Sequence, residues 1–279
     1  MTRLWKSLVW GVLFSGYRLS YCLSPEKKTL EIPVLLYHSI SQTDSRYAVT
    51  PHIFAQQMRY LKAHYCPVRL LEVAEFVKGQ GTLPDRAIAV TFDDGYADFF
   101  TNAFPLLEKY DIPATVFVCG GNVERKSLGN NLPLLSWEQI RALHHSGLIE
   151  IGSHALTHQN LTQLSQEDAT TEISASRAII GTQCGISPCC FAYPRGRFNM
   201  AVVQLVEKAG YEAAVTVESH LVQGGNPQAT RAQAQFMMPR LQIDRFTSLW
   251  MFQAKLTHAS NWHYAVLTMM GRKKSLHDF

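Results

Sequence analysis

The sequence predicts an α/β fold, a (β/α) barrel of seven or eight parallel strands. Short apolar runs of strand type alternate with helical segments along most of the chain, and this alternation implies a parallel sheet with helical crossovers. The number of such units favours a barrel over an open sheet. Acidic residues and a histidine stand directly after apolar runs, where the functional residues of barrels collect.

Length and composition fit one large folded domain. The 279 residues suffice for a sizeable core, and 47% apolar with 17% charged residues is typical of a globular protein. The net charge of +4 is small, and the basic residues form no stripe with interleaved aromatics. We therefore expect no nucleic-acid partner. The sequence leaves the oligomeric state open.

The first half of the chain supplies strands and helices in alternation. A continuous apolar run at 32–37 predicts the first strand, after a polar break at 24–28. Thr50 can cap a helix that has Pro51 in its first turn and continues to about residue 64. The next elements are expected as a helix at 70–77, a strand at 87–92, a helix at 102–110 and a strand at 114–118.

The second half repeats the pattern with clear capping signals. Ser136 and Gln139 form a capping box whose helix ends before Gly147. Ser165 opens a similar box, with a helix that ends near residue 181. The other expected elements are strands at 149–152, 191–193 and 213–217 and a helix from 199 to 210. The pattern weakens after about residue 249.

These elements divide the chain into three parts: an N-terminal signal-like or anchor segment at 1–31, a folded domain at 32–250 and a tail at 251–279. Arg3 and Lys6 precede an apolar stretch, which is the layout of a signal peptide. The stretch is short for a span of about 20 residues. We expect export to the periplasm or cell envelope, by cleavage or by membrane association. A cytoplasmic protein with an apolar N-terminal helix is the alternative.

The six cysteines contain no C-x-x-C pair, which argues against a structural zinc site. Cys184 with Cys189 or Cys190 can close a small loop in an oxidising compartment. Free buried thiols are the alternative.

Two short motifs carry the chemistry: Asp93-Asp94 after one apolar run, and His154 with His158 after another. Asp94 and the two histidines make a two-imidazole, one-carboxylate set that leaves open positions on a metal. Neighbouring residues of an extended chain point to opposite sides, so Asp93 is free to act as the base. The set fits metal-assisted hydrolysis. Zinc suits these ligands, and iron, cobalt or nickel are alternatives.

Three motifs also carry a family resemblance: Thr91-Phe-Asp-Asp-Gly95, Ser153-His-Ala-Leu-Thr-His158 and Phe191-Ala-Tyr-Pro-Arg-Gly196. With them the chain resembles the polysaccharide deacetylases of the NodB-homology, carbohydrate esterase 4 type, over roughly residues 32–250. The runs at 33–40, 136–137 and 152–153 look most like the poly-N-acetylglucosamine deacetylase branch. The resemblance implies a distorted barrel, a divalent metal and hydrolysis of N-acetyl groups. It also implies that Asp93 is the base and that Asp94, His154 and His158 hold the metal.

The third motif departs from the family. Much of the family has an arginine where this chain has Ala192 and an aromatic residue where it has Arg195. That arginine normally orients the base, so another residue must do so here. Arg195, Arg197 and Arg240 are the candidates, and the sequence does not decide among them. The backbone N–H of Arg195 can still serve as an oxyanion donor.

The general acid and the substrate contacts rest on weaker signals. The family often uses a histidine in a Leu-x-His motif, and His258 stands in such a motif. His220 follows a predicted strand but lacks the motif. His38 ends an apolar strand and is expected to line the pocket. Tyr193 and Pro194 are expected to form part of a sugar-binding wall.

Together these features predict a metal-dependent hydrolase that removes N-acetyl groups from an N-acetylglucosamine-containing polysaccharide. Two alternatives remain. One is a catalytically degenerate barrel that binds glycan without turnover. The other is the same metal site acting on another small amide.

Overall fold

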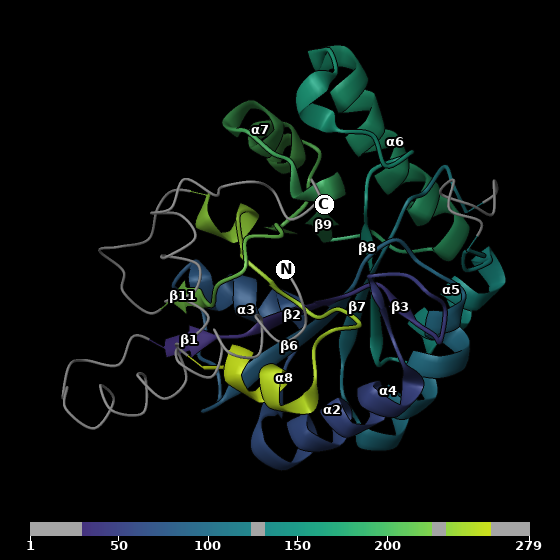
Figure 1. Cartoon of the computed structure of the whole chain (residues 1–279). Helices are drawn as coiled ribbons and strands as arrows, with labels where there is room; N and C mark the ends of the chain where they lie inside the picture. Colours follow the sequence, from purple (N-terminus) through teal and green to yellow (C-terminus); the bar gives the residue numbers. More distant parts are fainter. Residues whose placement is uncertain (1–29, 124–131, 225–232, 258–279) are drawn as a thin grey trace.

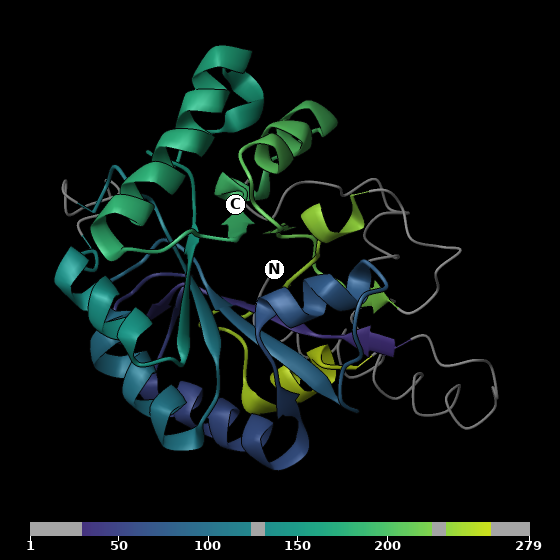
Figure 2. The ribbon, with the colours of Figure 1, turned by 180° about the vertical axis from the view of Figure 1, so that it is seen from behind.

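The structure, a computed structural model, describes residues 30–123, 132–224 and 233–257. A curled parallel sheet lies at the centre with helices around it (Figure 1), and Figure 2 shows the same arrangement from behind. The strands of this sheet are β2 (Val34–Tyr37), β5 (Cys66–Pro67), β6 (Ala87–Phe92), β7 (Ala114–Val118), β8 (Ile149–Ser153), β9 (Cys190–Ala192), β10 (Ala213–Val215) and β12 (Leu241–Gln242).

Helices connect these strands, as the alternating sequence pattern predicts. The α-helices are α2 (Pro51–His64), α3 (Leu70–Val77), α4 (Phe104–Tyr110), α5 (Trp137–His145), α6 (Gln166–Cys184), α7 (Met200–Lys208) and α8 (Leu249–Lys255). A π-helical turn η1 (Phe99–Ala103) leads into α4. Short 3₁₀ turns are η2 (Leu161–Gln163), η3 (Pro194–Gly196) and η4 (Ala234–Phe236).

The sheet confirms the predicted fold class, a distorted barrel of parallel strands. Seven strands follow the order β10-β9-β8-β7-β6-β2-β12, and β5 pairs with β6 as an eighth. One late segment of the chain forms hydrogen bonds with both β10 and β2. The Met238 amide donates to Ala214 O at 3.1 Å, and the Ile243 amide donates to Leu36 O at 2.9 Å. Residues 238–243 therefore link β10 to β2.

Alternation along the strands separates two faces. On β6, Ile88 and Val90 pack against the outer helices, whereas Ala87 and Ala89 face the other side with Phe117. This second face is lined by small residues, among them Ala192 and Ala213, and α3 covers part of it. Because successive side chains of a strand point to opposite faces, Thr91 and Asp93 continue the side of Ala87 and Ala89.

Helix capping follows the sequence signals. Ser136 Oγ accepts from the Gln139 amide at 3.2 Å, and Gln139 Oε1 accepts from the Ser136 amide at 2.9 Å. Ser165 Oγ accepts from the Asp168 amide at 3.1 Å. Helix α6 runs past the predicted end near residue 181, because the left-handed C-cap is Gly185, with φ of 70°.

The predicted first strand at 32–37 is interrupted at Pro33. Its first part, β1 (Leu30–Ile32), pairs antiparallel with β11 (Val222–Gly224), and only β2 joins the parallel sheet. Two further short strands, β3 (Ser39–Ile40) and β4 (Ala48–Val49), pair with each other.

The C-terminal boundary predicted at residue 250 is wrong, because α8 spans it. Phe252 of this helix is fully buried and belongs to the main core cluster. The apolar face of a seven-residue helix is a weak sequence signal, so the sequence pattern places the start of the tail inside this helix, at residue 251.

All five cysteines in the described part of the chain have free thiols, including Cys184, Cys189 and Cys190. Cys22 and the whole segment 1–29 lie outside the described residues. Among the helices that the structure describes, none has both the length and the apolar character needed to cross a bilayer.

Candidate metal centre

Asp94, His154 and His158 come together at the carboxyl ends of two strands. Asp94 follows β6, and His154 follows β8. Strand β7 lies between β6 and β8 and pairs with both. Asp94 Oδ1 lies 3.6 Å from His154 Nε2 and 3.5 Å from His158 Nε2. The three donor atoms all lie within 4.8 Å of one another. The spacing read from the sequence therefore corresponds to one cluster in space.

This cluster fits a divalent cation. Asp94 Oδ1 is buried, and in the described part of the chain it has no hydrogen-bond partner. A buried carboxylate oxygen that faces two imidazoles is a costly arrangement unless a cation joins them. Two nitrogens and one carboxylate oxygen are the donor set of an open catalytic site.

The local structure keeps His154 in the form that a metal ligand needs. Its Nδ1 lies 2.8 Å from Ala192 O. Because a carbonyl can only accept, Nδ1 carries the proton and Nε2 presents a lone pair toward Asp94. Burial lowers the pKa of His154 to about 4, outweighing the opposite effects of Asp93 and Asp94. The ring is therefore neutral at pH 7.

Asp93 is held by Arg240, one of the three arginines that the sequence left open. The Arg240 Nη atoms donate to the Asp93 carboxylate at 2.6 and 2.7 Å, one to each oxygen. Burial by itself raises the pKa of Asp93, but Arg240 and, more weakly, His154 and His38 act against it and hold this pKa well below its usual range. Asp93 is therefore ionised at neutral pH.

Arg240 is itself fixed in the interior of the curled sheet, where it is fully buried. Its Nε donates to Thr216 O at 2.8 Å, and one Nη lies 3.1 Å from Thr91 Oγ1. The guanidinium carbon stands 5.6 Å from the centre of the Phe117 ring. The small side chains of this face leave room for the guanidinium. The sequence carries a signal for this inward position. Leu241 and Ile243 face outward into the main core, so alternation along the strand turns Arg240 to the other side.

Strained backbone concentrates around the cluster. Of seven non-glycine residues with positive φ in the described part of the chain, four belong to the three motifs: Asp94 (72°), Ala155 (63°), His158 (66°) and Arg195 (56°). Such conformations cost about 1–3 kcal/mol each and persist where the surroundings determine them. In the loops after β6, β8 and β9, the backbone therefore adopts unfavourable conformations that place the side chains of the cluster.

His38 stands beside the same site. It directly follows β2, whose neighbour β6 leads into Asp93, and the Asp93 amide donates to Tyr37 O at 2.9 Å. The His38 side chain is buried, and its Nδ1 has no hydrogen-bond partner among the described residues. Its ring lies 5.0 Å from that of Tyr47. The imidazole is thus available to a ligand at the site.

Both residues of the predicted sugar-binding wall are buried. Tyr193 is fully buried, donates its hydroxyl to Phe236 O at 3.0 Å and packs in a cluster with Phe191 and helix α7. Pro194 is buried as well. Strand alternation places Tyr193 on the helix-facing side, opposite to Ala192, so its side chain points away from the metal centre.

Of the other candidate site residues, the structure describes Arg195 and His220 but not His258. Arg195 lies in η3, three residues after Ala192, which ends β9 and whose carbonyl accepts from His154. Its side chain is exposed, which leaves the backbone amide as the group that can act. His258 lies outside the described residues. His220 approaches Glu218 at 3.5 Å.

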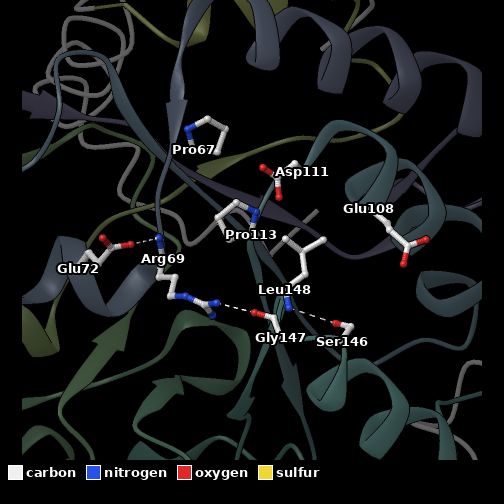
Figure 3. A pocket seen from close by; sticks show the side chains of 9 residues that line it. All are labelled: Pro67, Arg69, Glu72, Glu108, Asp111, Pro113, Ser146, Gly147 and Leu148. Carbon is white, nitrogen blue, oxygen red and sulfur yellow. Dashed lines mark hydrogen bonds between the residues drawn. The ribbon is translucent and has the colours of Figure 1, made fainter.

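A separate cavity of about 510 Å³ lies at the opposite end of the sheet. Figure 3 shows Arg69 beside it, with the guanidinium donating to Gly147 O. Pro113 and Leu148, which also line it, stand just before β7 and β8, and Pro67 pairs with Ile88 near the start of β6, so the cavity is at the amino-terminal side of the sheet. It is therefore distinct from the metal centre.

Comparisons with known proteins agree with the fold and the site. Residues 80–214 match the family model described as polysaccharide deacetylase. A poly-beta-1,6-N-acetyl-D-glucosamine N-deacetylase of Staphylococcus aureus is 27% identical over 196 residues, which cover 67% of this chain and 67% of that protein.

Two solved structures have similar folds. The Streptococcus pyogenes deacetylase PplD, in complex with acetate, has a TM-score of 0.72 and 25% identity, covering 82% of this chain and 100% of that chain. IcaB from Ammonifex degensii has a TM-score of 0.70 and 26% identity, covering 81% of this chain and 97% of that one. The chain therefore carries a polysaccharide deacetylase domain of the NodB-homology, carbohydrate esterase 4 type.

Proposed function

We propose that the protein is a metal-dependent hydrolase that removes N-acetyl groups from an N-acetylglucosamine polymer. One observation carries the proposal: the metal-ligand cluster of Asp94, His154 and His158 lies next to a buried carboxylate, Asp93, that a guanidinium keeps ionised. A catalytic metal and a charged base are the two parts that hydrolysis of an amide requires.

In this proposal Asp94, His154 and His158 hold the cation, with zinc first and iron, cobalt or nickel as alternatives. When bound, a divalent cation supplies Lewis acidity and makes a nearby water more acidic. Asp93 takes the proton from the attacking water, and its bidentate contact with Arg240 fixes the orientation of the carboxylate. The Arg195 amide donates to the developing oxyanion.

The leaving amine must receive a proton before the carbon–nitrogen bond breaks. His38 is buried at this site, and its Nδ1 has no hydrogen-bond partner among the described residues. We therefore add His38 to the predicted His258 as a candidate donor, in addition to its predicted place in the substrate pocket. Comparing His38→Gln with His258→Gln for loss of turnover at equal metal content distinguishes the two.

The polymer is inferred from a relative. The Staphylococcus aureus protein is a deacetylase of β-1,6-linked N-acetylglucosamine polymer, and its match covers most of the fold. We propose the same class of substrate here. Arg240 weakens the case for a degenerate binding barrel, because that reading gained support from the missing arginine at Ala192.

The test is acetate release from N-acetylglucosamine oligomers of differing linkage. The metal is first removed by chelation and then added back, for wild type, Asp93→Asn and His154→Ala in parallel. We expect metal-restored activity in wild type alone, with the highest rate on β-1,6-linked oligomers. Glycan binding without acetate release by the folded wild type would support the degenerate barrel. Activity only on small amides would support the third reading.

The location of the protein is a separate proposal, exported to the periplasm or cell envelope. It rests on Arg3, Lys6 and the apolar residues that follow them. Cell fractionation with an antibody to the C-terminus tests it. A signal confined to the cytoplasmic fraction would support the alternative.

A further inference from the structure

The segment between the two proposed histidine ligands is held by helix α6. Residues 154–158 contain two backbone positions with positive φ, Ala155 and His158. Such a segment does not keep its shape by local preference, because each left-handed position is unfavourable for a residue with a side chain. Contacts from elsewhere must therefore fix where the His158 ring stands.

Glu172 provides most of these contacts from α6. Its Oε2 accepts from the backbone amides of Leu156 at 3.1 Å and Thr157 at 2.9 Å. Its Oε1 accepts from the hydroxyl of Thr157 at 2.5 Å and from Gln159 Nε2 at 3.4 Å. One buried carboxylate thus receives four hydrogen bonds from Leu156, Thr157 and Gln159, all within two residues of His158.

Other groups hold the beginning of the segment. Ser176, one helical turn beyond Glu172, donates to Ala155 O at 2.8 Å. The loop after β7 contributes the amides of Gly120 and Gly121, which donate to Ala155 O at 3.3 Å and Leu156 O at 2.9 Å. These hydrogen bonds reach residues 155 and 156, whereas those of Glu172 reach 156, 157 and 159. The position of His158 therefore depends on Glu172 more than that of His154 does.

We infer that Glu172 is a positioning residue that sets the place of His158 in the metal centre. This inference rests on the proposed function, because it assumes that His158 is a metal ligand. Glu172 touches neither the donor atoms nor the substrate in this assignment. It acts by holding the backbone amides of Leu156 and Thr157, just before His158, as outer-sphere partners fix the orientation of ligands.

The test measures the affinity for Zn²⁺ by competition with a chromogenic chelator at fixed pH. We expect Glu172→Ala to weaken Zn²⁺ binding about 10–100-fold, the usual effect of removing an outer-sphere partner. Glu172→Gln keeps an oxygen for the two backbone amides, so its affinity should stay within about threefold of wild type. Glu172→Asp shortens the side chain by one methylene, and we expect it to lose affinity while remaining folded.

Two controls separate positioning from general destabilisation. Glu167→Ala removes an exposed glutamate from the same helix, and Ile180→Ala opens the core beneath α6 away from the loop. The second should lower the melting temperature and leave Zn²⁺ affinity unchanged. Unchanged Zn²⁺ affinity in Glu172→Asp and Glu172→Ala, or an equal loss of Zn²⁺ affinity in Ile180→Ala, overturns this inference and leaves the proposed function standing. A folded wild type that binds no divalent metal overturns the proposed function together with it.

Discussion

At the scale of single residues, the Asp93–Arg240 pair is buried on both sides and bound through two hydrogen bonds. A pair of this kind gives modest net stability, because both charges have lost their water. Removing one partner is more costly, since the other charge stays buried without compensation. The pair therefore makes a specific thermodynamic prediction.

We expect Arg240→Met to destabilise the protein by about 3–5 kcal/mol and to abolish acetate release. Adding Asp93→Asn to Arg240→Met should restore much of the stability and none of the activity, because no charge is then left unpaired. Urea unfolding of the two single variants and the double variant measures this coupling. Additive losses of stability would contradict the buried pair.

The half-buried carboxylate of Glu150 predicts a pH effect. Its pKa is raised by burial, while the hydrogen bond from Thr115 Oγ1 at 2.9 Å partly opposes this rise. The folded state therefore prefers the protonated form. Ionisation destabilises the fold as pH rises from the unfolded pKa of about 4.3 through the folded pKa.

We accordingly expect Glu150→Gln to be more stable than wild type at pH 8, since the amide keeps the shape and stays neutral. The difference should shrink as pH falls and vanish near pH 4. Urea midpoints at several pH values measure it. A difference that does not depend on pH would mean that ionisation of Glu150 is not its source.

Single residues of the candidate site could be predicted from the sequence where they belong to a short motif. The spacing of His154 and His158 and their place after a strand were enough to group them with Asp94. Arg240 remained one of three candidates, because its contact with Asp93 spans 147 positions of the chain. Glu172 was missed, since it binds backbone amides and so has no partner motif. Its one signal was an acidic residue within the buried stripe of α6.

At the scale of elements, β8 leads into His154, a proposed metal ligand, and contains a glycine, Gly152. A methyl group at Gly152 would lie 2.5 Å from Phe117 Cδ1 and 3.0 Å from Cys190 O. The Phe117 ring in turn lies against the Arg240 guanidinium. Packing in β8 is therefore connected to Arg240 through Phe117, and Arg240 in turn holds Asp93.

We expect Gly152→Ala to cost about 1–3 kcal/mol of stability, as overpacking of a core usually does, and to lower turnover. Phe117→Leu in the same chain should recover part of the stability, because the smaller side chain removes the clash. Thermal melts of both variants, with Phe117→Leu alone as the control, measure this. Wild-type stability of Gly152→Ala would show that the ring moves aside freely.

Elements were predicted well where local signals suffice. The predicted bounds of α3, β6 and β7 match the structure, because capping residues and apolar runs define them. The break at Pro33 and the two-residue strand β12 were not foreseen. Both depend on pairing with distant segments, β1 with β11 and β12 with β2, and such pairing leaves little trace in a local pattern.

At the scale of the whole molecule, a bound metal would join loops that follow two separate strands. A ligand that binds only the folded state stabilises it by about 2.7 kcal/mol at a hundredfold excess over its Kd. For a domain of this size, that corresponds to a rise in melting temperature of roughly 5–10 °C.

We expect chelation to lower the melting temperature by this amount and Zn²⁺ to restore it. His154→Ala should melt at the same temperature with and without the metal, because it lacks one ligand. Differential scanning calorimetry on matched samples measures both. An equal response of His154→Ala to chelation would place the stabilising metal elsewhere.

The link between β10 and β2 through residues 238–243 also determines when the site becomes complete during synthesis. The ribosome makes Asp94, His154 and His158 well before it makes Arg240. A nascent or truncated chain that ends before residue 238 therefore contains all three proposed ligands but lacks the guanidinium that compensates Asp93. The three proposed metal ligands are thus made first, and the partner of the proposed base is made last.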